Sequence, residues 1–441
     1  MTTPESNAAT EVGSGLNEEE VRRRHILPKA LVVGLVAGVV ASAFRLALAW
    51  AEDLRNHQLG GLHGWPSFAA WTSLGALAGG LGLWMVRRLA PEAAGSGIPH
   101  LQAVLLGKTR LHWKRLLPVK FIAGVIGIGG GLTLGREGPT VQMGGASGLM
   151  VADWFRVKAG GGERKALISA GAGAGLAAAF NSPLAGMIFV LEELQGNFTP
   201  VVFVAAFLAS VSSDVVSRLL VGDKPVFHLE AMPAMSVNEL PLALLLGLLA
   251  GLLGVVFNKC LLGSLDGFDR LTRSKWLGGA VAGFVAGIAG WTMPHLSGGG
   301  GTLADQAIAG EIAVGILPLL LIARFVLTMT CYGCGTAGGI FAPLLVLGAL
   351  GGLLFGHGIA HLSPAWMPNP ESFAVLGMGA LFTAIVRAPL TGIVLMVEMT
   401  GKYDFMLPLL ASCLAAYGVT EWLGSAPIYD QLRQRAERNA A

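Results

Sequence analysis

The chain has 441 residues, of which 53% are hydrophobic and only 13% are charged, and its formal net charge is +3. This balance is typical of a protein that resides in lipid and not of a water-soluble enzyme. The small net charge gives no reason to expect a nucleic-acid partner. The 4 cysteines are too few for a disulfide framework.

Both ends of the chain are polar. Residues 1–25 begin with an acidic stretch that predicts disorder, and arginines at 22–24 stand directly before the first apolar segment. More arginines follow the last apolar segment, in the predicted tail 425–441. Because positive residues flank membrane segments on the cytoplasmic side, we expect both termini to be cytoplasmic.

Apolar segments of two lengths lie between these ends. Those near the roughly 20 residues that a membrane-spanning helix needs are 30–50, 68–90, 115–134, 198–220, 238–258, 276–293, 312–330, 342–361 and 404–421. The shorter ones are 96–106, 137–151, 166–180, 184–195, 372–385 and 389–400. Short segments indicate broken or re-entrant helices, which are tolerated only where they are buried or line a polar cavity. We therefore predict an all-α polytopic membrane protein with an internal polar pathway.

The sequence states one pattern twice. G-x-x-x-P-x-x-x-x-G occupies 135–144 and again 339–348, and the ordered set G-x-G, P-L-x-G and Glu within 171–192 recurs with the same spacings within 377–398. Two halves with matching Gly/Pro interruptions are typical of a transporter whose site lies between its repeats.

We place the first transmembrane repeat at 26–222 and the second at 236–424. The polar groups inside these apolar repeats are the candidates for chemistry, because ionisable side chains at membrane depth are costly and usually functional.

Glu137 is the strongest candidate. It opens a predicted helix whose first residues leave backbone N–H groups free to face an anion. A deprotonated carboxylate would occupy that anion site, and a protonated one could leave and admit another anion. Glu137 would then be a gate and a proton carrier. The alternative is a glutamate that merely stabilises the helix through its dipole, by about 0.3–1 kcal/mol.

Two further segments open helices in the same way. Residues 95–99 offer Ser96 and free N–H groups, and residues 338–343 offer N–H groups without any charge. Amides and hydroxyls bind an anion firmly enough to strip some water and weakly enough to release it. Tyr403, at a predicted helix break, is either another hydroxyl donor or an aromatic residue at the membrane interface.

Together, GSGIP at 95–99, GREGP at 135–139, GGIFAP at 338–343 and Tyr403 after EMTGK resemble the CLC family of chloride channels and chloride/proton exchangers. The resemblance covers about residues 28–425. It implies two inverted-topology repeats with broken and re-entrant helices, and a homodimer with a chloride path in each subunit. A chain without C-terminal regulatory domains is expected to be a prokaryotic member in the bacterial inner membrane.

The resemblance also implies roles for single residues. Ser96 and Tyr403 would place hydroxyls on a central chloride, together with the amides of Ile340 and Phe341, and Glu137 matches the external gating glutamate. Three further residues are expected along the anion pathway: Gly95, Arg136 and Gly138. No catalytic residue, metal or cofactor is expected, and the substrates would be chloride and protons.

Glu193 favours an exchanger over a passive voltage- or pH-gated channel. Glu192 recurs as Glu398, but Glu193 has no copy in the second half and matches the internal proton glutamate of CLC exchangers. The alternative is an exposed helix end. Gln102 and His100 depart from the acids that many bacterial exchangers carry there. Two alternatives follow: a rearranged proton entry, or a Glu193 that ionises more readily without an acidic neighbour.

Two other patterns carry weaker hypotheses. Ser147, within G-x-S-G, fits an intramembrane serine protease, but that spacing is common in helices rich in small residues. Lys120, Arg136 and Arg324 would attract anions into the vestibules, or equally would extend to the membrane interface.

Overall fold

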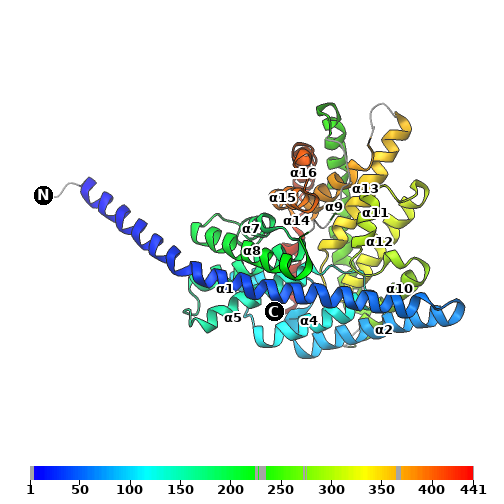
Figure 1. The fold of residues 1–441 in the computed structure, drawn as a ribbon, viewed down its shortest axis with the longest axis horizontal. Helices are drawn as coiled ribbons and strands as arrows, with labels where there is room; N and C mark the ends of the chain where they lie inside the picture. Colours follow the sequence, from blue (N-terminus) through cyan, green and yellow to red (C-terminus); the bar gives the residue numbers. More distant parts are fainter. Residues whose placement is uncertain are drawn as a thin grey trace.

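The computed structural model describes residues 4–223, 227, 235–271, 274, 276–363 and 369–440, with side chains described from His25 to Asn439. Regular structure in these ranges is helical, without a named strand (Figure 1). The helices of the first half are α1 (Pro4–Gly60), α2 (Gly64–Leu89), α3 (Ile98–Leu105), α4 (Trp113–Gly129), α5 (Glu137–Trp154), α6 (Gly162–Phe180), α7 (Pro183–Phe189) and α8 (Pro200–Val221).

The second half repeats this order. Its helices are α9 (Leu240–Leu271), α10 (Leu277–Thr292), α11 (Gly301–Ile308), α12 (Leu317–Gly333), α13 (Phe341–Leu362), α14 (Ser372–Val386), α15 (Pro389–Thr400), α16 (Met406–Trp422) and α17 (Ile428–Ala440). Each apolar segment expected from the sequence overlaps a helix, although several extend beyond it, such as 115–134 beyond α4. Among the described residues, 7 helices are long and apolar enough to cross a membrane by length and composition: α1 from His25, α2, α8, α9 with its leading turn, α12 with its leading turn, α13, and α16 with its leading turn.

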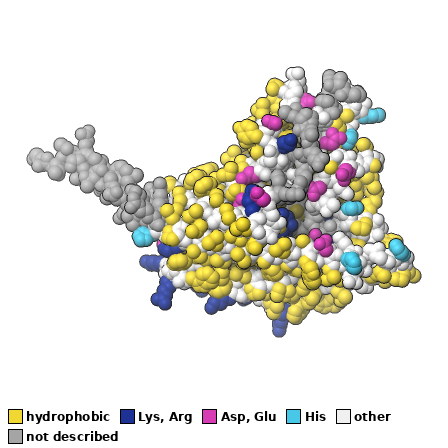
Figure 2. Space-filling model, viewed as in Figure 1, with side chains coloured by type: hydrophobic (Ala, Val, Ile, Leu, Met, Phe, Trp, Pro, Cys, Tyr) yellow, Lys and Arg dark blue, Asp and Glu magenta, His cyan; other side chains and the backbone are white. Residues whose placement is uncertain are grey.

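The surface has the arrangement that a membrane requires. Figure 2 shows hydrophobic side chains over a broad band of the face in view, with Lys and Arg gathered along one edge and acidic and histidine side chains toward the other. A belt of this kind suits the hydrocarbon layer, and the charged edges suit the two aqueous sides.

The repeated glycines are contacts between helices. A Cβ added to Gly144 of α5 would lie 2.1 Å from the carbonyl oxygen of Gly171 in α6, and one added to Gly348 of α13 would lie 2.5 Å from that of Gly377 in α14. No side chain fits at these positions, and the close backbone approach is the packing that small residues allow between membrane helices. The same contact in both halves explains why this spacing recurs.

Two terminal segments differ from expectation. Helix α1 begins at Pro4, although composition predicts disorder over residues 1–25; the Ala and Glu content of this segment favours helix. The predicted tail contains α17, whose first residues Ile428 and Tyr429 are fully buried. Residues 425–441 are therefore not only a tail, because the start of this helix packs into the core.

Candidate functional site

The three helix-opening motifs meet at the centre of the molecule through backbone hydrogen bonds. Gly135 N–H donates to Gly339 O at 2.7 Å, and Gly339 N–H donates back to Gly135 O at 2.8 Å. Gly95 N–H donates to Thr336 O at 3.0 Å, and Gly338 N–H donates to Gly95 O at 3.1 Å. The openings of α3, α5 and α13 are thereby fixed against one another, as expected for a site between two repeats.

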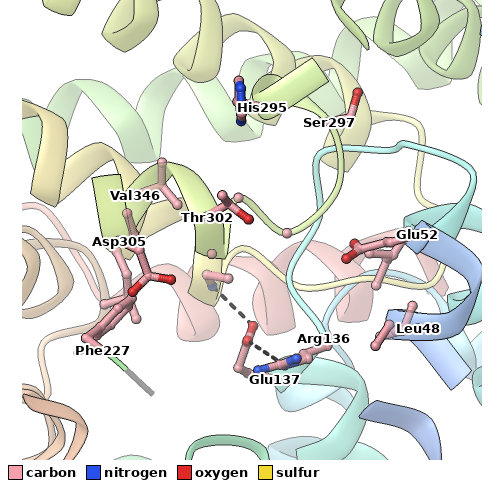
Figure 3. Close-up of a pocket in the computed structure, with 18 of the residues that line it drawn as sticks. Leu48, Glu52, Arg136, Glu137, Phe227, His295, Ser297, Thr302, Asp305 and Val346 are labelled. Carbon is pink, nitrogen blue, oxygen red and sulfur yellow. Dashed lines mark hydrogen bonds and ion pairs between the residues drawn. The ribbon is translucent and has the colours of Figure 1, made fainter. Parts of the chain in front are cut away.

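Glu137 is the first residue of α5, and only 2% of it is exposed. Its Oε2 accepts a hydrogen bond of 3.2 Å from Ala342 N–H in the first turn of α13 (Figure 3). Ile340 is the N-cap of that helix, and Arg136 Nε lies 3.7 Å from Glu137 Oε1. The carboxylate therefore lies at a helix N-terminus, in the position that suits an anion.

Ser96 and Phe341 lie beside Glu137 in the fold and are almost fully buried. A Cβ added to Gly138 would lie 2.7 Å from Ser96 Cβ, so glycine is required for α5 to pass the Ser96 loop. The Phe341 ring packs against Phe180 and Phe382, with centroids 5.3 and 4.7 Å away. This packing fixes the start of α13 and the direction of its free amides.

Tyr403 does not belong to this site. It is 72% exposed, in the turn Tyr403–Phe405 that precedes α16, which agrees with the alternative interpretation as an interfacial aromatic residue. Tyr429 lies inside the protein instead: it is fully buried, and its hydroxyl has no hydrogen-bond partner among the described residues. It interacts electrostatically with Glu137 and Glu193. The assignment of the central hydroxyl to Tyr403 was wrong because exposure depends on how helices pack.

A sequence signal for Tyr429 exists. Pro427 precedes the apolar pair 428–429, and a strongly polar helix follows, which is a helix-start pattern with one buried turn. Because the rest of this segment is strongly charged, we predicted a solvated tail over 425–441.

Glu193 lies in the π-helical turn Val190–Gln195 that extends α7. Gln102 Nε2 of α3 donates to Glu193 Oε1 at 2.9 Å and to Glu193 O at 3.3 Å. The expected proximity of these two residues is thus present, with a neutral amide as the partner of the carboxylate. Gln102 Oε1 is buried and has no partner among the described residues.

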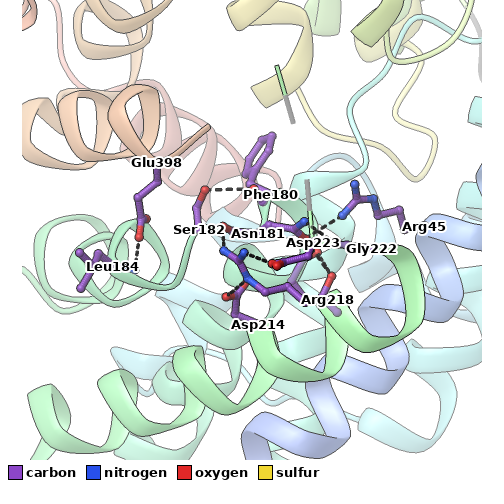
Figure 4. Close-up of polar contacts among 12 residues, drawn as sticks. Arg45, Phe180, Asn181, Ser182, Leu184, Asp214, Arg218, Gly222, Asp223 and Glu398 are labelled. Atoms are coloured by element: carbon purple, nitrogen blue, oxygen red, sulfur yellow. Dashed lines mark hydrogen bonds and ion pairs between the residues drawn. The ribbon is translucent and has the colours of Figure 1, made fainter. Parts of the chain in front are cut away.

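Glu192 and Glu398, the repeated pair, each cap a helix in the opposite half. Glu192 accepts from the backbone N–H groups of residues 390–391 at 3.0 and 2.8 Å, and Glu398 accepts from those of residues 184–185 at 3.1 and 2.8 Å (Figure 4). These carboxylates are anions at the N-termini of α15 and α7. They hold the repeats together. Glu193 is the glutamate of this region that has no counterpart in the second half.

Two cavities approach the centre. One, the Glu137 cavity, has a volume of about 390 Å³, and its charged lining residues include Glu52, Arg55, Arg136, Glu137 and Asp305. The other, the Ser96 cavity, has a volume of about 580 Å³, and its polar lining residues include Ser96, His100, Lys108, Tyr332, Arg433 and Arg435. Both linings mix charges: the Glu137 cavity has three carboxylates and two arginines, and the Ser96 cavity has Glu92 and Glu437 beside its basic residues.

Other candidate residues have structural contacts. Ser147 is fully buried, and its hydroxyl donates to Met143 O within α5 at 2.9 Å, so it is not placed as a nucleophile. Lys120 and Arg324 are also fully buried and bind backbone carbonyls, so they neither line a vestibule nor reach the membrane interface.

Known proteins show the same pattern over nearly the whole chain. The family model of the voltage gated chloride channel matches residues 74–421. The H(+)/Cl(-) exchange transporter ClcA of Vibrio parahaemolyticus is 42% identical over 422 residues, which are 94% of this chain and 90% of that protein. The chain belongs to the CLC family of voltage gated chloride channels. The protein of the same name from Salmonella agona is also 42% identical, over 93% of this chain and 88% of its own.

Solved CLC structures agree with the fold. A slow cyanobacterial Cl-/H+ antiporter superimposes with a TM-score of 0.88 at 36% identity, covering 93% of this chain and 97% of its own. A eukaryotic CLC transporter superimposes with a TM-score of 0.79 at 23% identity over 94% of this chain, a likeness of fold alone. The predicted all-α, CLC-type membrane fold is confirmed.

Proposed function

We propose that this CLC protein is a chloride/proton antiporter, with Glu137 as the external gate and proton carrier and Glu193 as the internal proton acceptor. The observation that carries the proposal is the Glu137 carboxylate bound to Ala342 N–H at the start of α13. An anionic side chain there competes with a mobile anion for the same donors. The relatives named as H(+)/Cl(-) exchange transporters support exchange as the activity.

The chloride step uses neutral donors. We assign the central chloride to the Ser96 hydroxyl, the amides of Ile340 and Phe341, and the Tyr429 hydroxyl, which replaces the Tyr403 of our prediction. Donors without full charge replace part of the ion's hydration and still release it. Arg136, lining the Glu137 cavity, attracts anions toward the gate, and Gly95 and Gly138 let the donor loops approach closely.

The proton step uses two carboxylates on different helices. Glu193 takes a proton from the cytoplasmic side and passes it to Glu137, whose neutral form leaves the donors of α13 and admits chloride. Gln102 orients the Glu193 carboxylate and does not itself exchange a proton at physiological pH. The Ser96 cavity faces the cytoplasm in this scheme, because α17 and its arginines line it.

A homodimer in the bacterial inner membrane, with both termini cytoplasmic, completes the proposal. Each subunit would carry its own path, as the resemblance to the CLC family implies.

The test compares two variants reconstituted in liposomes, Glu193→Gln and its neighbour Glu192→Gln as the matched control. Chloride and pH electrodes measure the chloride flux and the proton movement. Glu193→Gln should abolish coupled proton movement and leave chloride flux. Glu192→Gln should keep coupling, since Glu192 caps α15 and is outside the path. Uphill proton movement by Glu193→Gln would refute the role of Glu193. Chloride flux without any proton movement in the unmodified protein would instead favour the passive channel.

A further inference from the structure

Tyr332, near the end of α12, is a buried tyrosine that the scheme above does not use. It is 4% exposed, and it lines the Ser96 cavity beside Gly95 and Ser96. A Cβ added to Gly95 would lie 3.0 Å from the Tyr332 hydroxyl oxygen, so the hydroxyl lies directly against the loop that carries Ser96. That oxygen is within hydrogen-bonding reach of both the backbone N–H and the side-chain hydroxyl of Ser96.

The chemistry of these groups fixes their directions. A backbone N–H can only donate, so a hydrogen bond from Ser96 N–H to the Tyr332 oxygen would leave the tyrosine O–H free to donate. Ser96 Oγ is an acceptor within reach of that O–H. A serine oxygen that accepts from Tyr332 keeps its single proton for a third partner. Ile98 N–H, which also points at Ser96 Oγ at 3.4 Å, reinforces this direction.

The loop that carries Ser96 is held in place by its backbone conformation and by buried hydrogen bonds. Gly95 has φ +59°, a conformation that favours glycine, and its carbonyl oxygen accepts from Lys120 Nζ at 2.6 Å and from Gly338 N–H. The loop therefore cannot turn Ser96 away from Tyr332 without breaking buried hydrogen bonds.

We propose that Tyr332 is a positioning residue for chloride: its hydroxyl turns the Ser96 O–H toward the central anion. The inference rests on the proposed function, because it assumes that Ser96 binds chloride. It adds a residue on the inner side of the site, at the boundary with the Ser96 cavity. Loss of one neutral hydrogen bond corresponds to a change in affinity of roughly three- to tenfold.

The test is a double-mutant cycle of chloride affinity, measured by isothermal titration calorimetry on the purified full chain. The variants are Tyr332→Phe, Ser96→Ala and the double variant, and exposed Tyr403→Phe is the control. Tyr332→Phe should weaken chloride binding roughly three- to tenfold without changing the thermal unfolding temperature. If Tyr332 acts through Ser96, adding Tyr332→Phe to Ser96→Ala should change nothing further.

Two results would overturn the inference: an unchanged affinity in Tyr332→Phe, or an equal loss from Tyr332→Phe with and without Ser96. A failure of the proposed function itself would give different results from these two. In that case the unmodified protein binds no chloride, or Ser96→Ala binds it as tightly as the unmodified protein.

Discussion

Lys120 and Arg324 make the same contact in the two halves of the chain. Lys120 Nζ donates to Gly95 O at 2.6 Å, and Arg324 Nη2 donates to Gly299 O at 2.6 Å. The two cations are 204 residues apart in the sequence, and so are the two glycines. In each half a cation on a long helix thus holds the loop before a short one, α3 or α11. The two halves of the chain therefore repeat this hydrogen bond as well as their glycine contacts.

This relation predicts an asymmetric effect of two equivalent substitutions. Lys120→Met and Arg324→Met should each destabilise the protein by about 1–3 kcal/mol, because buried carbonyls lose their donor. Only Lys120→Met should also weaken chloride binding, since Gly95 adjoins Ser96. Thermal unfolding in detergent and chloride titration measure the two effects, with exposed Lys114→Met as control. Equal loss of chloride affinity in both variants would contradict the assignment of the central site to Ser96.

The correction from Tyr403 to Tyr429 has its own test. Tyr429→Phe removes a buried hydroxyl that has no described protein partner, so it should weaken chloride binding several-fold while leaving the fold stable. Tyr403→Phe changes an exposed side chain and should bind as the unmodified protein does. Chloride titration of the two variants decides between them, and the reverse order would restore Tyr403.

Glu192 and Glu398, each of which caps a helix in the opposite half, should affect the stability of the protein but not the coupling of chloride to protons. Glu192→Gln and Glu398→Gln each replace a carboxylate that accepts two helix N-terminal hydrogen bonds, at a cost of about 0.5–2 kcal/mol. Both variants should unfold at lower temperature and still exchange chloride for protons. Loss of exchange at full stability in either one would place that glutamate in the transport path.

Gln102→Glu should make stability depend on pH. The new carboxylate would lie against Glu193, where the amide now donates at 2.9 Å. Two carboxylates at that distance share a proton, because both cannot be ionised together at low cost. Raising the pH removes the shared proton, so the unfolding temperature of the variant should fall between about pH 5 and 8. A pH profile parallel to that of the unmodified protein would mean that the two side chains separate.

Much of this molecule was readable from the sequence, because membrane helices are long, apolar and separated by Gly and Pro. Glu137 and Ser96 were predicted as site residues because their motifs open helices at membrane depth, and the structure places both at buried helix starts. The repeated glycines predicted two equivalent halves, and the contact of Gly144 with Gly171 supplies the physical reason.

What the sequence concealed depends on tertiary packing. Tyr429 lies in the first turn of a strongly polar helix, and the packing of that helix against α3 and α14 buries it. Lys120 resembled an anion attractor because its type gives no hint of the carbonyls that surround it. Tyr332 follows a Cys in an apolar helix, and nothing in the local pattern connects it with Ser96, more than 200 residues away.

Proton movement in liposomes that hold the unmodified protein tests the central claim most directly. A chloride gradient is the only driving force, the membrane voltage is clamped near zero, and a dye inside the vesicles reports pH. The account predicts that protons move against their own gradient, driven by chloride through Glu137 and Glu193. Chloride flux with no uphill proton movement would contradict it and identify the protein as a passive channel.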